Sequence, residues 1–78
     1  MLRVNKDLVI KTIVSKYRTI SGFLRETKLF SRVRFYEILS YSFNKEFMDY
    51  RLKNNNFGPQ KLAEALGLTL EEILTEDE

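Results

Sequence analysis

The chain lacks both cysteine and histidine, and this double absence excludes whole classes of chemistry. None of its 78 residues is Cys or His, so a disulfide framework and a thiolate zinc site are ruled out. Histidine is the commonest general base and metal ligand, so Ser-His and Cys-His catalysis are ruled out with it. Glycine-rich phosphate loops are absent as well. We therefore expect no enzyme activity, no cofactor and no metal.

Long hydrophobic runs are missing too, and so are most helix-breaking residues. No stretch approaches the ~20 apolar residues of a membrane span, and the start of the chain lacks a signal-peptide core. We therefore expect a cytoplasmic protein without a membrane partner. Only three glycines and one proline occur, and no segment alternates with the period of a strand. These features predict an all-α fold, in which residues 1–78 form a single domain.

Apolar residues recur at helical spacing in several segments, which predicts a compact bundle of five to six short helices. Thr69 and Glu72 form a capping-box pattern, and Gly67 is suited to end the preceding helix. Ser31 and Asn44 are expected to cap two further helices. The expected helices are residues 6–18, a short one after 19–22, one after Ser31, one from Asn44 to 54–56, one opening at Gly58-Pro59, and a last one capped by Thr69. Residues 75–78 are expected to form a frayed acidic tail.

The charges are unevenly distributed along the chain. Residues 1–53 contain twelve of the thirteen Lys and Arg but only five of the eleven acidic residues. Residues 54–78 contain one Lys and six acidic residues. A basic body joined to an acidic end indicates a surface that faces a polyanion such as nucleic acid. The alternative is a small basic domain that binds nothing anionic.

The C-terminal sequence LAEALGLTLEEIL, residues 62–74, resembles the end of Cro/C1-type (XRE-like) helix-turn-helix domains. The earlier part of the chain is similar to the motif itself. Ser21 corresponds to the cap of the first motif helix, Phe23-Leu24 to its apolar pair, Phe30-Ser31 to the step into the recognition helix, and Phe35 with Ile38 to its inward pair. The chain departs from the family where the turn glycine is replaced by Lys28 or Leu29, and in the long segment Tyr41–Phe57.

This resemblance implies a sequence-specific DNA-binding transcriptional regulator of phage or mobile-element type, either Cro-like or repressor-like. Its partner would be double-stranded operator DNA, and it would act by occluding a promoter. The helix Ser31–Leu39 would enter the major groove, where long polar side chains of its first turn reach base edges. Candidate base contacts are Ser31, Arg32, Val33, Tyr36 and Ser40. Candidate phosphate contacts are Thr19, Ser21, Lys28, Arg34, Lys45, Arg51 and Lys53.

The segment Phe43–Phe57 contains more apolar residues than one buried helix face takes. These residues either complete the small core or form the interface of a homodimer, since helix-turn-helix proteins commonly bind two half-sites through two-fold symmetry. The candidates for the dimer interface are Phe43, Phe47, Tyr50 and Phe57. A second hypothesis is a protein-binding module on the same fold, such as an antirepressor or a repressor modulator. That module would bind a phage or host regulatory protein through this segment or the acidic end.

Overall fold

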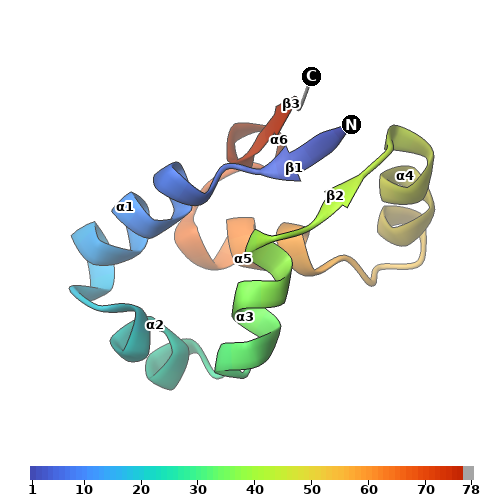
Figure 1. The fold of residues 1–78 in the computed structure, drawn as a ribbon. Helices are drawn as coiled ribbons and strands as arrows, with labels where there is room; N and C mark the ends of the chain where they lie inside the picture. The colour runs from blue at the N-terminus through green and yellow to red at the C-terminus, as the bar shows by residue number, and fades with distance from the viewer. Residues whose placement is uncertain (77–78) are drawn as a thin grey trace.

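The computed structural model describes residues 1–76, which form six helices and three short strands (Figure 1). In chain order the elements are β1 (Leu2–Val4), α1 (Lys6–Tyr17), α2 (Ile20–Thr27), α3 (Arg32–Leu39), β2 (Ser42–Phe43), α4 (Lys45–Lys53), α5 (Gly58–Leu66), α6 (Leu70–Ile73) and β3 (Leu74–Glu76). The fold is therefore mostly helical, as the apolar spacing predicts. The first helix ends at Tyr17, one residue earlier than expected.

The mostly helical fold also contains a three-stranded antiparallel sheet, which the prediction of an all-α fold did not include. The strand order is β2-β1-β3, with Leu2 opposite Phe43 and Arg3 opposite Thr75. In the sheet β1 and β3, the first and last elements of the chain, lie side by side (Figure 1). Strands of two or three residues are too short to show a period of two, and their partners lie far apart in the sequence. The expected frayed tail is also wrong for residues 75–76, which belong to β3; residues 77–78 lie outside the described part.

Side-chain caps fix the starts of five helices. Asn5, Thr19, Ser31, Asn44 and Thr69 each accept a hydrogen bond from a backbone amide three residues on. Thr69 and Glu72 form the complete capping box that the sequence predicts. The cap of α2 is a correction, because Thr19 rather than Ser21 accepts the amide of Gly22. The side chain of Ser21 is thereby left available for another contact.

The core lies where α1, α2, α3, α5 and α6 converge. Its fully buried side chains include Ile13 of α1, Phe23 of α2 and Phe35 of α3. The apolar residues of α1 extend beyond its buried surface, since Val14 is 49 % exposed. Lys16 of α1 also donates a hydrogen bond to the carbonyl of Leu66, the last residue of α5. A lysine at this place stabilises the negative end of the helix.

Candidate nucleic-acid interface

Helices α2 and α3 are joined by a tight turn over residues 28–31. Lys28 ends α2 in the left-handed conformation, with φ 53° and ψ 24°, and its amide bonds to the carbonyl of Leu24. This is the conformation for which glycine is the usual residue, and a non-glycine side chain adopts it at a cost of about 1–2 kcal/mol. Ser31 then caps α3 by accepting the amide of Arg34 at 3.1 Å. Lys28 therefore adopts the left-handed conformation that a glycine usually supplies at the end of a helix.

The inner face of α3 is fixed in the core. Phe35, Ile38 and Leu39 are all buried, and the ring of Phe35 lies 5.9 Å from that of Phe23 in α2. On the other side, the start of α5 approaches α3 closely. A Cβ built at Gly58 would lie 2.8 Å from Cδ1 of Ile38. Aromatic packing from α2 and this glycine contact from α5 together set the position of α3.

The outer face of α3 carries the candidate base contacts. Val33 is 69 % exposed and Tyr36 is 43 % exposed, and both are large apolar or aromatic groups. Ser31, Arg32 and Ser40 are exposed as well. At about 100° per residue, Val33, Tyr36 and Ser40 lie on one side of the helix, with Arg32 at its edge. The structure therefore brings four of the five predicted residues onto one surface. Ser31 is the exception, because it caps the helix one turn before the buried Phe35 and so lies toward the inner face. Ser40 also bonds to the helix backbone.

Arg32 is held in place by α2. Its Nη2 donates a hydrogen bond to Oγ of Ser21 at 2.6 Å. Ser21, predicted to contact phosphate, thus orients an arginine of the neighbouring helix. Arg25 is also exposed. It follows Ser21 by one helical turn, so it borders the same surface. Arg25 was not among the residues predicted from the sequence to contact DNA. Its spacing of four residues from Ser21, which places both side chains on one side of a helix, is the feature that could have indicated it.

Arg34 lies on the other flank of α3. Its Nη1 donates hydrogen bonds to Oη of Tyr41 and, at 3.3 Å, to Oε2 of Glu37, and the guanidinium packs over the Tyr41 ring. The bond to Tyr41 is the largest of the effects that raise the pKa of Arg34 above its usual value. Arg34 is therefore a permanent cation whose main contacts lie within the protein. Glu37 also places an acidic side chain on the exposed part of α3.

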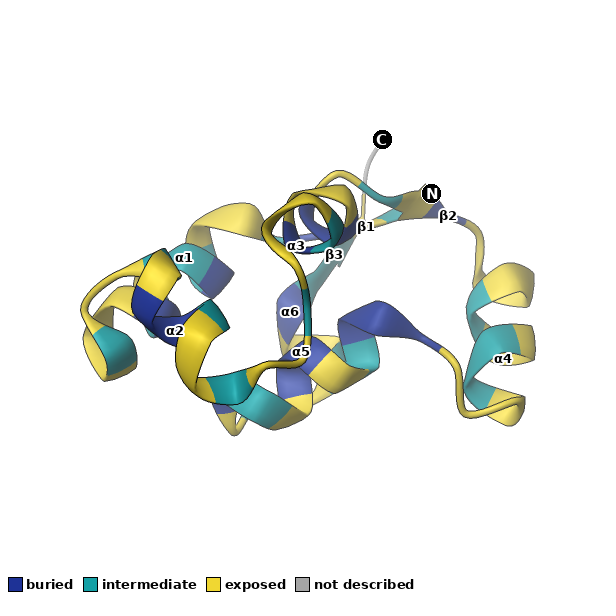
Figure 2. Ribbon diagram, turned by 90° about the horizontal axis from the view of Figure 1, so that it is seen from below, coloured by how far each residue is buried: buried dark blue, intermediate teal, exposed yellow. Residues whose placement is uncertain are grey.

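The six predicted phosphate contacts other than Arg34 fall into two separate groups. Thr19, Ser21 and Lys28 belong to α2 and the residues at its ends, beside α3. Lys45, Arg51 and Lys53 belong to α4, which stands at the opposite end of the molecule from α2 (Figures 1 and 2). Arg51 is further tied to its own loop through a 2.6 Å hydrogen bond to the carbonyl of Asn56. The two groups do not form one continuous surface around α3.

The four candidates for a dimer interface also separate. Phe43 and Phe57 are only 4 % and 3 % exposed, and their rings pack edge to face at 5.1 Å. Since each is covered by the other within one protomer, neither is available to a partner, which corrects their assignment as interface residues. Phe47 and Tyr50 are 43 % and 66 % exposed and remain accessible on α4.

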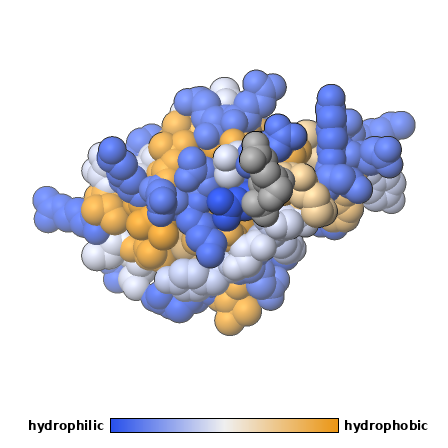
Figure 3. Space-filling model, turned by 45° about the horizontal axis from the view of Figure 1, so that its top comes forward, coloured by the Kyte–Doolittle hydropathy of each residue, from blue (hydrophilic) through white to orange (hydrophobic). Residues whose placement is uncertain are grey.

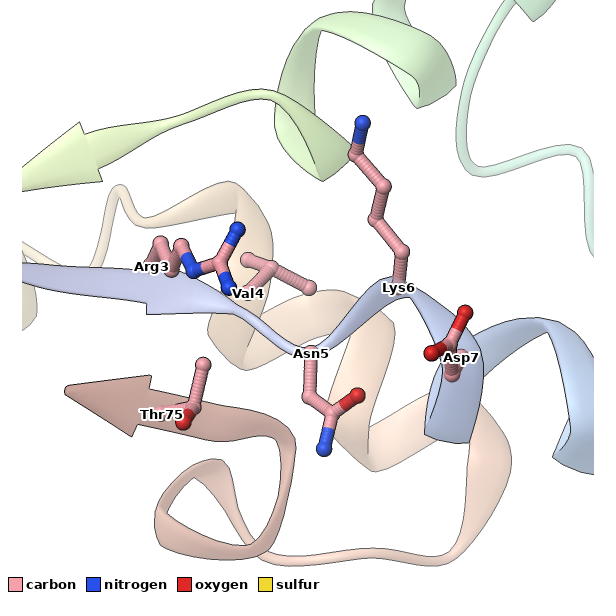
Figure 4. Close-up of a pocket in the computed structure, with 6 residues that line it drawn as sticks. All are labelled: Arg3, Val4, Asn5, Lys6, Asp7 and Thr75. Carbon is pink, nitrogen blue, oxygen red and sulfur yellow. The ribbon is translucent and has the colours of Figure 1, made fainter. Parts of the chain in front are cut away.

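The hollow beside the start of α1 does not assemble a site. A hollow of about 160 Å³ is lined by Arg3, Val4, Asn5, Lys6, Asp7 and Thr75. In Figure 4 the Lys6 side chain points away from Asn5 and Thr75, so the polar groups diverge. Within residues 1–76, no three His, Cys, Asp or Glu side chains are grouped closely enough to hold a metal ion. The helices of the same region are all too short or too polar to cross a lipid bilayer.

Comparisons with protein-family models, with curated proteins and with solved structures give no match for this chain.

Proposed function

We propose that this chain is a DNA-binding transcriptional regulator in which α2 and α3 act as a helix-turn-helix. In this proposal α3 enters the major groove of operator DNA, and a homodimer occupies two half-sites and blocks access to a promoter. Arg32 contacts guanine, Val33 contacts a thymine methyl group, and Tyr36 and Ser40 extend the contact along the groove. Lys28 and Arg25 bind the phosphates on either side.

The outer face of α3 is the observation that carries the proposal. Val33 is the most exposed large hydrophobic side chain in residues 1–76, and it stands beside Arg32 on a helix whose opposite face is buried. A single exposed valine is ordinary on a protein surface. Together with Arg32 and Tyr36 it provides the apolar and cationic groups that a groove-reading helix uses in its first turns. The size of the molecule is also suitable. Its dimensions are 34 × 26 × 22 Å, so two protomers side by side fit major grooves about 34 Å apart.

The salt dependence of duplex binding tests the proposal. Residues 20–40 contain four Lys or Arg and two Glu, so we expect two or three phosphate contacts per protomer. Each contact lowers log K by about 0.9 per unit of log salt, which predicts a slope of about −2 to −3 for one protomer. Fluorescence anisotropy of labelled duplexes, including DNA flanking the gene, measures this slope.

Absence of duplex binding at low salt, or a slope near zero, would contradict the proposal. Co-purification with a repressor, without any DNA binding, would instead favour the alternative of an antirepressor or repressor modulator.

A further inference from the structure

Helix α4 is attached to the fold without burying any of its nine side chains. In Figure 2 it carries exposed and intermediate residues only, and it stands at one end of the molecule. Phe47 and Tyr50 are 43 % and 66 % exposed on this helix. They are three residues apart, so they are neighbours on one face. Two exposed aromatic rings on one helix face indicate an interaction surface.

The apolar surface of α4 continues onto the sheet. A hollow of about 260 Å³ is lined by Met1, Ser42, Phe43, Asn44 and Phe47. Met1 is itself 62 % exposed. In Figure 3 pale orange apolar atoms lie on the side of α4, bordered by blue polar side chains. We call Met1, Phe47 and Tyr50 the α4 patch.

The charges beside the α4 patch identify a second copy of the chain as its occupant. Glu46 and Lys53 are seven residues apart, so they lie on the same flank of α4, two turns from each other. Neither forms an ion pair within residues 1–76. When two such helices pack antiparallel around a two-fold axis, equal flanks meet with their order reversed. Glu46 then lies opposite the partner's Lys53, whereas parallel packing around a two-fold axis puts equal flanks on opposite sides, so that Glu46 and Lys53 would not meet.

We propose that two copies of this chain associate through antiparallel α4 helices, with Tyr50 next to the two-fold axis. The midpoint between Glu46 and Lys53 falls between residues 49 and 50, which places Tyr50 at the centre and Phe47 beside it. Two Glu46–Lys53 pairs then close the flank of the interface, one on each side of the axis. Operator binding needs a homodimer, and the role of this contact in supplying it rests on the proposed function. The association of two copies through α4 does not depend on that function.

The contact is small. A nine-residue helix is about 13 Å long, and two aromatic side chains per copy bury less than the roughly 1,200 Å² of a standard interface. The dimer is therefore weak in free solution, with a dissociation constant on the order of 100 μM. On DNA, two adjacent half-sites hold the copies at a high effective concentration, so the same weak contact becomes cooperative binding.

A charge-reversal cycle on the full chain tests the proposal by sedimentation equilibrium. Glu46→Lys and Lys53→Glu each set like charges against each other across the axis, and each is expected to raise the dissociation constant of the dimer about fivefold or more. The double variant restores opposite charges and returns the constant to within about twofold of the original. Lys11→Glu on α1 is the matched control, with the same charge reversal at an exposed residue outside α4, and leaves the constant unchanged.

The proposal is overturned if the single reversals have no effect, if the double variant is no better than either single one, or if the chain stays monomeric up to about 1 mM. Duplex binding is measured separately on the unmodified chain. A restored dimer without duplex binding would remove the DNA-binding proposal and leave the α4 contact standing. If the chain binds duplex DNA but the charge reversals leave the dissociation constant of the dimer unchanged, the α4 contact is removed and the DNA-binding proposal stands.

Discussion

Phe35→Ala is expected to lower the free energy of unfolding by about 3–5 kcal/mol. Phe35 is fully buried, and its ring contacts Phe23 of α2 at 5.9 Å and Tyr36 at 5.3 Å. A domain of this length has a total stability of roughly 4–12 kcal/mol. The substitution therefore removes a large part of that stability and also loosens the contact that fixes α3 against α2. Urea unfolding followed by circular dichroism measures the loss.

Tyr36→Ala is the matched control for this prediction, because it removes an aromatic ring one residue further along the same helix. Tyr36 is 43 % exposed, so its loss is expected to cost about 1 kcal/mol or less. Equal costs for the two substitutions would show that α3 is not fixed by its inner face, and the assignment of its outer face as free for DNA would fail with it.

Arg32→Ala is expected to weaken binding to the preferred duplex by about 1–3 kcal/mol, or about 5- to 150-fold, with little effect on random DNA. The guanidinium of Arg32 is exposed and is oriented by Oγ of Ser21 at 2.6 Å. That bond uses one of the five N–H donors of the guanidinium, and the others remain for a bidentate contact with guanine. Competition binding with duplexes selected from a random pool measures both affinities.

Lys28→Ala provides the comparison for Arg32→Ala. A phosphate contact carries no sequence information, so this variant is expected to weaken binding to all duplexes alike and to reduce the salt slope by about 1. If Arg32→Ala behaves in the same way as Lys28→Ala, Arg32 is a phosphate contact and the reading of bases by α3 loses its main residue.

Local hydrogen bonding made the helix boundaries predictable from the sequence. The capping box of Thr69 and Glu72, the cap residues Ser31 and Asn44, and the left-handed Gly67 involve groups within three or four residues of each other. Such contacts form whenever the segment is helical, so the residue types alone predict them. The inner face of α3 was predictable for the same reason, since helical spacing separates its buried side from its exposed side.

Contacts between distant segments were not predictable in this way. The sheet joins residues 2–4 to 42–43 and 74–76, and such short strands leave no periodic pattern. The burial of Phe43 depends on Phe57, fourteen residues further on. Ser21 and Thr19 both carry hydroxyl groups suited to a cap. Thr19 takes that position, and its amide bonds to the Tyr17 carbonyl at 2.8 Å in the turn that precedes α2.

The most direct test of α3 as the DNA-reading helix is to follow the backbone amide resonances of the isotope-labelled protein while duplex DNA is added. Specific and non-specific complexes both use the face that meets the phosphates. We therefore predict that the largest shifts fall within residues 19–40, over α2 and α3, and that the amides of α5 and α6 stay unchanged. Shifts centred on α4 or on the acidic α5 and α6, or no shifts at all, would contradict the assignment of α3 as the DNA-reading helix.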